Sequence, residues 1–233
     1  MTADVGQLVA VCTVHEVRPD PGMKGRTAID KRPRSGAVSV GADALAGDII
    51  ADEVNHGGRD QAVYAYAQEE ADRWAAELGP AVGPGWFGEN LTVTGIAVTD
   101  AVIGERWCIG GDRPDATVLE VTLPRTPCAT FGRWAQQPHW VKRFTERGDV
   151  GAYLRVVSAG TVCAGDQVRV LSRPGHGVSV RELFRAEDPA RLALLLEGGI
   201  DVPAKAVARA LRVLRRARVG AGPGPDAPSA QPG

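Results

Sequence analysis

Residues 117–128, Thr-Val-Leu-Glu-Val-Thr-Leu-Pro-Arg-Thr-Pro-Cys, bring a strand to an end at a cysteine. Thr117–Thr122 alternates β-branched residues with others, which predicts a half-buried strand. The two prolines that follow fix φ and lack a backbone donor, so the strand must end there. Cys128 is then placed on a stiff loop close to Arg125, and a nearby cation favours the reactive thiolate. The alternative is that Cys128 is a small buried apolar residue, as many free cysteines are.

Short strand-like segments with glycine turns recur along the chain, whereas few segments have helical periodicity. We expect a strand at Leu8–Val17 and an amphipathic helix at Gln68–Leu78. The pattern between residues 128 and 148 is helical and is broken by Pro138. Many short strands with few helices predict a mainly β fold, a closed or nearly closed β-barrel. Further strands are expected at Ala37–Val40, Ile49–Val54, Gln61–Tyr66, Asn90–Thr94, Trp107–Ile109, Tyr153–Val157 and Gln167–Leu171.

Two regions interrupt this strand pattern. Residues 18–35 are polar, with three prolines and several basic residues, and we expect a long functional or disordered loop there. After residue 173 the composition becomes that of short helices, and Ser179 and Glu182 fit a capping box. The expected helices are Val180–Arg185, Pro189–Leu196 and Pro203–Arg218. The expected divisions are a β-barrel at 7–173, a three-helix segment at 177–218 and a disordered tail at 219–233.

Composition is that of an ordinary globular protein, with 44% hydrophobic and 24% charged residues in a chain of 233. A net charge of −1 gives no general attraction to nucleic acid or to a membrane surface, so we expect neither as a partner. We see no secretory signal and no apolar run that could span a bilayer, and we expect a cytoplasmic protein. The four cysteines lack a C-x-x-C pair, which disfavours a zinc ribbon or a thioredoxin-type site.

Two glycine-framed segments carry groups suited to chemistry. In His56-Gly57-Gly58-Arg59-Asp60 the glycines allow close approach of the backbone to a ligand, while the imidazole and guanidinium supply a proton donor and an anion clamp. The alternative is a hairpin turn with polar residues. Asn90 begins another strand, and its amide needs hydrogen-bond partners. Neither a G-x-G-x-x-G fingerprint after a strand, nor a P-loop, nor a G-x-S-x-G elbow is present.

Seven collinear motifs make the chain resemble the MOSC family, proteins similar to the C-terminal domain of molybdenum cofactor sulfurase. The branch it looks like is the YiiM type, in which a three-helix segment follows the barrel. The resemblance covers about residues 7 to 215. The motifs are the basic stretch around Lys31, Ala44–Asp48 (ALAGD), His56–Tyr66 (HGGRDQAVYAY), Phe87–Leu91 (FGENL), Ile103-Gly104, Pro124–Cys128 (PRTPC) and Gly160–Asp166 (GTVCAGD).

The resemblance implies a barrel that binds the molybdenum cofactor, a pterin with a dithiolene and a phosphate. Cys128 would be the thiolate ligand of molybdenum, which suits a soft metal, and Arg125 would help to keep it ionised. His56 would be the catalytic proton donor. Asp30 stands where family members often have an uncharged residue, and it would weaken phosphate binding unless it turns outward. The other cofactor-binding residues would be Lys31, Arg32 and Arg59 for the phosphate, and Asn90 and Thr126 for the pterin and the remaining metal ligands.

Related members reduce N-hydroxylated purines, amidines or hydroxylamines, so the resemblance implies a molybdenum-dependent oxidoreductase. The chain has no flavin, haem or iron–sulfur signature, so a separate electron-donor protein with a flavin or an iron–sulfur cluster would be required. A second hypothesis is a carrier of the molybdenum cofactor or of sulfur, with a persulfide on Cys128. Pyridoxal phosphate belongs to the other domain of the sulfurase. With four lysines and no recognisable Schiff-base motif, we do not expect it here.

Overall fold

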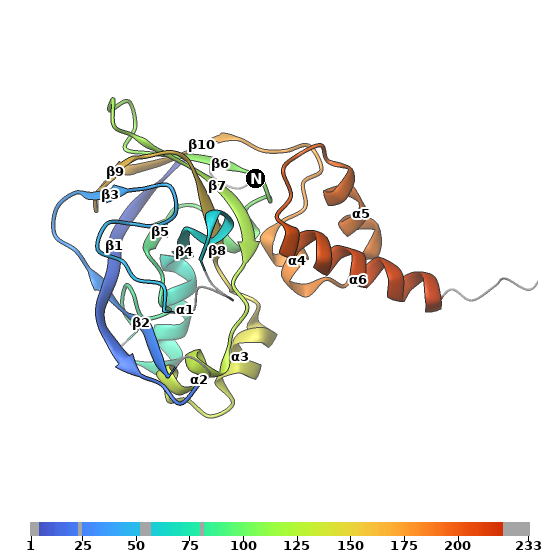
Figure 1. Cartoon of the computed structure of the whole chain (residues 1–233), viewed down its shortest axis with the longest axis horizontal. Helices are drawn as coiled ribbons and strands as arrows, with labels where there is room; N and C mark the ends of the chain where they lie inside the picture. Colours follow the sequence, from blue (N-terminus) through green and yellow to red (C-terminus); the bar gives the residue numbers. More distant parts are fainter. Residues whose placement is uncertain (1–4, 23–24, 52–56, 80–81, 221–233) are drawn as a thin grey trace, which may run out of the picture.

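The computed structural model describes residues 5–22, 25–51, 57–79 and 82–220, and its centre is a closed barrel of seven strands among those residues (Figure 1). Neighbouring strands are antiparallel except β4 and β5, which are parallel and are joined through α1 (Gln68–Leu78). A parallel pair requires such a crossover. The barrel strands, in order of neighbours, are β1 (Val5–Pro19), β5 (Leu91–Thr94), β4 (Val63–Ala67), β8 (Ala152–Ser158), β7 (Thr117–Pro124), β6 (Arg106–Ile109) and β10 (Gln167–Ser172).

The long strand β1 both closes the barrel and extends beyond it. Its first residues pair with β10 and its middle with β5, whereas residues 12–19 pair with β2 (Arg26–Pro33). Register shifts in the β1–β2 pair mark β-bulges, which increase the local twist and bend the strand. The β1–β2 ribbon therefore projects from the barrel and forms one wall at its end. A separate two-stranded sheet joins β3 (Val38–Val40) to β9 (Gly160–Val162).

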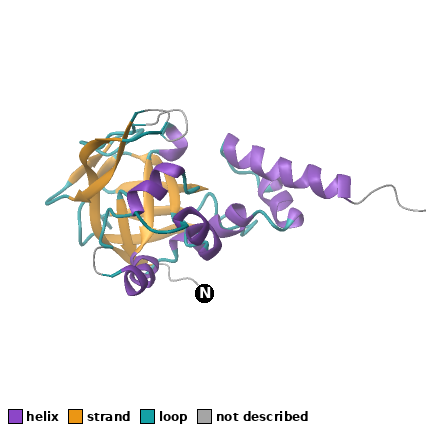
Figure 2. Ribbon diagram, turned by 90° about the horizontal axis from the view of Figure 1, so that it is seen from below, coloured by secondary structure: helices purple, strands orange, loops and turns teal. Residues whose placement is uncertain are grey.

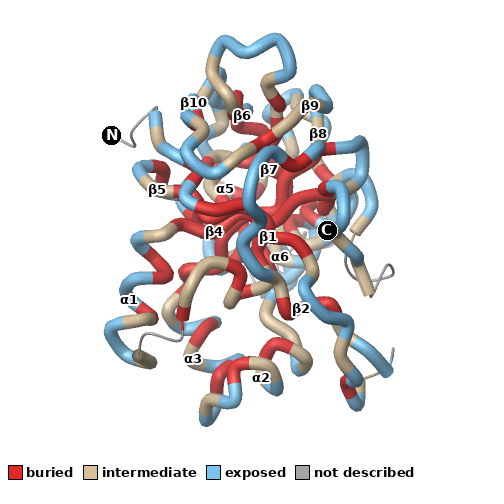
Figure 3. Tube along the Cα trace, turned by 90° about the vertical axis from the view of Figure 1, so that its left-hand side faces the viewer, coloured by how far each residue is buried: buried red, intermediate tan, exposed pale blue. Residues whose placement is uncertain are grey.

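The buried residues are concentrated in the barrel, and further ones lie at the end that carries α1, α2 and α3 (Figure 3). There α2 (Ala129–Ala135) and α3 (Trp140–Arg147) cover an aromatic cluster. The Phe131 ring centroid lies 5.1 Å from that of Phe144 and 5.4 Å from that of Trp140. Such pairs add to the free energy of burying each ring. This cluster fixes α2, and with it the residues that precede the helix.

Three helices follow the barrel and stand at its side (Figure 2). They are α4 (Val180–Arg185), α5 (Pro189–Glu197) and α6 (Ala204–Gly220). Ser179 and Glu182 form the expected capping box at the start of α4. Ala206 and Ala210, on one face of α6, are buried. Short 3-10 turns occur at η1 (Arg59–Gln61) and η2 (Val98–Asp100).

The structure confirms the mainly β fold class with its C-terminal helices and corrects two local predictions. Residues 18–35 are not a structureless loop, because Arg26–Pro33 pairs with the part of β1 that leaves the barrel. Of the strand expected at Ile49–Val54, residues 49–51 are irregular and the rest lies outside the described residues. The domain divisions stay predictions, and the tail from residue 221 lies outside the described part. No helix in that described part has the length and apolarity to cross a membrane.

Candidate functional site

A cavity of about 420 Å³ lies where β7 ends, between the β1–β2 ribbon and α2. Cys128 lines it directly after the Pro124–Pro127 turn and is the N-cap residue of α2. The thiol is free and half-buried, whereas the Cys12 and Cys108 side chains are buried. Burial also raises the pKa of the Cys12 thiol. Cys128 is the one cysteine on the described wall of the cavity.

An ion pair between the buried Asp20 and the exposed Arg133 lies beside this thiol. The Arg133 guanidinium donates to Asp20 from Nε at 2.8 Å and from Nη2 at 2.6 Å, and both side chains line the cavity. Two parallel bonds of this kind are stronger than a single one and hold the guanidinium in one orientation. The pKa of Arg133 is raised, first by the Asp20 hydrogen bonds and to a lesser degree by the charge of a Cys128 thiolate. Arg133 is therefore a cation close to Cys128.

Arg125 contributes a second cation to the wall. It is 6% exposed, and its guanidinium carbon lies 3.8 Å from the Phe131 ring centroid and 5.4 Å from that of Tyr64. Its Nη1 atom is buried and has no hydrogen-bond partner within the described chain. An unpaired buried donor is costly, by about 1–3 kcal/mol. Arg125 also lines the cavity.

Asn90, Asp48 and Lys31 form a hydrogen-bonded group on another side of the cavity. The Asn90 amide nitrogen donates to Asp48 at 2.8 Å and to the Cys12 carbonyl at 3.2 Å, while its oxygen accepts from the Tyr64 N–H at 3.1 Å. Lys31 Nζ lies 2.5 Å from the same Asp48 oxygen. All three interactions of the Asn90 amide are thus made within the barrel. Its expected role in pterin binding stays a prediction.

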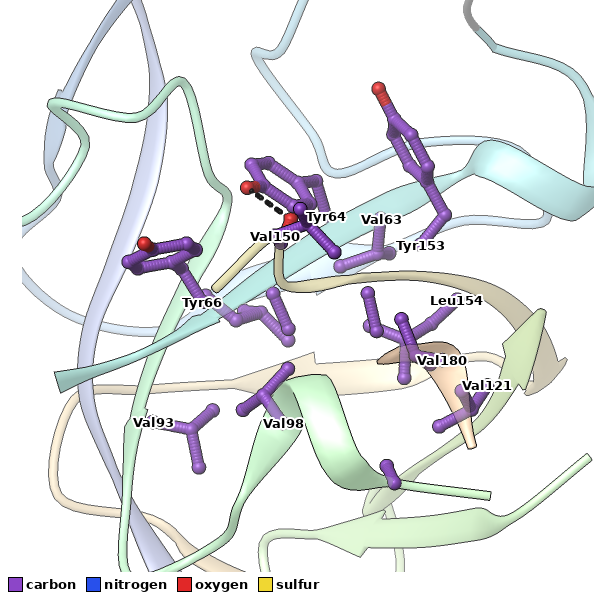
Figure 4. Packing of buried hydrophobic residues seen from close by; sticks show 14 of the residues in the cluster. Val63, Tyr64, Tyr66, Val93, Val98, Val121, Val150, Tyr153, Leu154 and Val180 are labelled. Atoms are coloured by element: carbon purple, nitrogen blue, oxygen red, sulfur yellow. Dashed lines mark hydrogen bonds between the residues drawn. The ribbon is translucent and has the colours of Figure 1, made fainter. Parts of the chain in front are cut away.

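Tyrosine rings complete the wall. Tyr64 and Tyr153 come from the adjacent strands β4 and β8, and their ring centroids are 5.3 Å apart. Both lie on the side of these strands opposite Val63 and Leu154, and the Tyr64 hydroxyl donates to the Val150 carbonyl at 2.9 Å (Figure 4). Burial raises the pKa of Tyr153, and the neighbouring Arg125 opposes this rise. Both phenols therefore stay neutral near pH 7.

A family model described as the MOSC domain matches residues 52–169. The chain belongs to the MOSC family. It is 36% identical over 160 residues to the uncharacterized protein YflK of Bacillus subtilis, spanning 69% of this chain and 70% of YflK. It is also 33% identical over 162 residues to a protein named Reductase from Gibberella moniliformis, of which it spans 28%. That match covers 68% of this chain.

Solved structures support the fold of this MOSC chain over a longer range. The crystal structure of YiiM from Geobacillus stearothermophilus has a TM-score of 0.71 at 23% identity, over 90% of this chain and 99% of that one. YiiM from Escherichia coli has a TM-score of 0.66 at 21% identity, over 94% of both chains. These matches extend beyond the barrel, so the expected YiiM-type arrangement with C-terminal helices is confirmed. At this level of identity they show the fold alone.

Only some of the residues expected to form the site lie on the cavity wall of this MOSC barrel. Cys128, Arg125, Asn90 and Lys31 line the cavity, but Arg32, Arg59 and Thr126 do not. Arg32 pairs with Asp30, Arg59 pairs with Asp201, and Thr126 is exposed to solvent. His56 lies outside the described residues. Their functional roles stay predictions.

Asp30, the acid expected to weaken phosphate binding unless it turns outward, is also absent from the described cavity wall. It is 3% exposed and lies 2.8 Å from Arg18 Nη2 and 3.2 Å from Arg32 Nε. Its charge is therefore compensated by two cations outside the cavity.

Several wall residues were not selected from the sequence. Asp20 and Arg26 lie within residues 18–35, where the sequence predicts a loop. The sequence does not mark Arg133 as a site residue, because only the fold of α2 brings it to Cys128. Asp48 and Gln61 could have been found, since both belong to the motifs that resemble the MOSC family. No cluster of three or more His, Cys, Asp or Glu side chains in the described residues could hold a metal ion. A metal at Cys128 would therefore need ligands that arrive with it.

Proposed function

We propose that this protein binds the molybdenum cofactor in the Cys128 cavity and reduces N-hydroxylated compounds. MOSC domains are associated with binding of this cofactor. The observation that carries the proposal is the half-buried Cys128 thiol in a cation-lined cavity of about 420 Å³. That volume lies within the range of about 300–1,000 Å³ typical of small-molecule sites. A thiolate is a ligand that soft metals prefer, and the dithiolene would bring the other sulfur ligands.

The cavity also fits the anionic part of the cofactor. Arg125 lines the cavity, and its Nη1 has no hydrogen-bond partner in the described residues. Arg26 lines the same cavity and has no ion-pair partner in the described chain. Lys31 and Arg133 are already neutralised by Asp48 and Asp20. Arg125 and Arg26 would therefore be the first cations to bind a phosphate, since charge-assisted hydrogen bonds are the strong ones.

When bound, the cofactor supplies the two-electron chemistry at the nitrogen–oxygen bond. The overall reaction converts an N-hydroxyl group, two electrons and two protons into an amine and water. The protein would bind and orient the substrate against the tyrosine wall and exclude bulk water. Since the sequence has no flavin, haem or iron–sulfur signature, a separate electron-donor protein with a flavin or an iron–sulfur cluster would deliver the electrons. His56 stays the proposed proton donor.

Molybdenum analysis of protein expressed with the cofactor available tests this proposal. Wild-type protein should hold stoichiometric molybdenum with its pterin, and Cys128→Ser should lose most of the metal. Cys163→Ser is the matched control, because that thiol is also free and half-buried but lies outside the described cavity wall. The loaded wild type should reduce an N-hydroxylated amidine with an artificial electron donor. Equal metal in the wild type and Cys128→Ser would refute the ligand role.

A carrier function is the second candidate, because the positive charge of Arg133 would also stabilise a persulfide anion on the half-buried Cys128. Sulfane sulfur on Cys128 without molybdenum in the purified protein would favour it. A pyridoxal phosphate function is disfavoured by geometry. Lys31 is the lysine on the described cavity wall, and its ammonium group is paired with Asp48, whereas a Schiff base needs a neutral amine.

A further inference from the structure

Asp48 holds residues 49–51 against the cavity. Its side chain is 2% exposed and accepts a hydrogen bond from the Val14 N–H at 2.9 Å, in addition to those from Lys31 and Asn90. Val14 belongs to β1 and Lys31 to β2, so these bonds attach Asp48 to the β1–β2 ribbon. Hydrogen bonds to a charged group are among the strong ones. The irregular segment that follows lines the cavity and is therefore held on the ribbon side of it.

Two large apolar side chains of this segment are not explained by the hydrophobic core. Ile49 is 49% exposed, Ile50 is half-buried, and both line the cavity. Within the described chain, neither belongs to the core cluster or to the partly buried side chains that pack against it. An exposed apolar residue is ordinary by itself. Two neighbouring isoleucines on the wall of a cavity form an apolar surface that a ligand would remove from water.

Ile29 of β2 enlarges this apolar surface. It lines the cavity and also packs against the core, which fixes its position. A Cβ atom at Gly88 would lie 3.1 Å from Ile29 Cγ1, and one at Gly57 would lie 3.0 Å from Ile50 Cδ1. Glycine at these two positions, where φ is 76° and 92°, therefore leaves room for both isoleucines beside the backbone. We call Ile29, Ile49 and Ile50 the isoleucine wall.

The isoleucine wall and Cys128 belong to opposite sides of the cavity. The cavity lies between the β1–β2 ribbon and α2. Ile29 is part of the ribbon, and Asp48 attaches the other two isoleucines to it. Cys128 is the N-cap residue of α2. A ligand whose reacting group is bound at Cys128 therefore has the isoleucine wall available for the rest of its skeleton.

We propose that the three residues of the isoleucine wall determine specificity by binding the apolar skeleton of the substrate. The substrates favoured are N-hydroxylated compounds with an uncharged alkyl or alkyl-substituted aryl skeleton, over those whose skeleton is small or charged. Burial of apolar surface against the wall is the driving force. This inference rests on the proposed function, which supplies the N-hydroxyl group and its position at Cys128.

Binding of product amines, measured by calorimetry without reductant on protein expressed with the cofactor available, tests this recognition apart from turnover. The probes are aniline and 4-ethylaniline, which differ by two apolar carbons. Wild type should bind 4-ethylaniline about 4- to 16-fold more tightly, because each buried carbon contributes up to about fourfold. Ile49→Asn should reduce this preference about threefold. Ile50→Ala should also reduce it, and Ile49→Leu, which has the same number of carbons, should retain it.

Leu171→Asn is the matched control. Leu171 of β10 is 48% exposed, close to the value for Ile49, and lies outside the described cavity wall. Its replacement should leave the preference for 4-ethylaniline unchanged. Equal or undetectable binding of the two amines by the wild type would overturn the inference. The same preference in wild type and Ile49→Asn, or an equal loss in Leu171→Asn, would also overturn it.

The reductase assay distinguishes this inference from the proposed function. Its substrates are N-phenylhydroxylamine and the 4-ethyl derivative of that compound. If wild type binds 4-ethylaniline selectively but reduces neither hydroxylamine, the proposed function fails and the recognition by the isoleucine wall stands. If both hydroxylamines are reduced with equal kcat/KM and the two amines bind equally, the proposed function stands and the role of the isoleucine wall fails.

Discussion

Replacing Asn90 by alanine should destabilise the barrel whether or not a cofactor is bound. The side chain is 3% exposed, and its amide satisfies the Tyr64 N–H and the Cys12 carbonyl, which both belong to buried residues. Each buried backbone group left without a partner costs about 1–3 kcal/mol, so the two together cost about 2–6 kcal/mol. The middle of this range, about 4 kcal/mol, corresponds to a decrease in Tm of roughly 8–16 °C for a chain of this size.

Urea denaturation of the cofactor-free protein measures this loss directly. Gln68→Ala is the control, because that amide donates to Asp72 on an exposed helix surface and its removal should change stability by less than about 0.5 kcal/mol. The reasoning is refuted if Asn90→Ala unfolds like the wild type while its molybdenum content decreases. Such a result would show that the amide binds the pterin rather than the two strands.

Three further outcomes are expected. Burial raises the pKa of Glu70 to about 7, so the folded protein favours the protonated carboxyl group more than the unfolded chain does. The contribution of Glu70 to the free energy of unfolding therefore decreases as the pH rises from 4.5 to 7. Glu70→Gln should remove a pH dependence of up to about 3 kcal/mol in urea titrations. A disulfide reagent at pH 8 should modify Cys128 in the native protein much faster than Cys12, whose thiol is buried with a raised pKa; equal rates would contradict the placement of the two thiols. Ser179→Ala should cost about 0.5–2 kcal/mol by removing the cap of α4, and an unchanged Tm would count against it.

Local sequence rules predicted the helices and strands whose bounds depend on interactions between neighbouring residues. The alternation in Thr117–Thr122 and the two following prolines predicted that β7 ends just before Cys128, and β7 does end at Pro124. The predicted helix at Gln68–Leu78 has the bounds of α1. The Ser179 capping box was also correct, because the two side chains that satisfy the helix donors are three residues apart. In each case the determining interactions lie within a few residues of one another.

The cavity wall could not be predicted in this way, because its composition depends on contacts between distant residues. The sequence of Arg26–Pro33 predicts a polar loop. In the structure this segment is a strand, because β1 continues past the barrel and pairs with it. The ion pair between Asp20 and Arg133 joins residues 113 apart and needs both that ribbon and α2. The motif residue Asn90 is expected to bind the pterin, and that role stays a prediction. The sequence does not show the three interactions that its amide makes inside the protein.

Arg125 and Arg26 on the cavity wall have no carboxylate partner in the described residues. For binding a ligand anion, these two cations would count for more than the total number of cations on the wall. Asp48 and Asp20 hold Lys31 and Arg133 in fixed positions, so a ligand anion would have to compete with carboxylates for these groups. Arg125 faces no such competition, and stacking on Phe131 fixes its guanidinium while the Nη1 donor stays unpaired. A donor that is rigid and unpaired before the ligand arrives loses little entropy on binding and gains a charge-assisted bond. The aromatic cluster beneath α2 thus stabilises the fold, and under the proposed function it would also hold Arg125 in place for an anionic ligand.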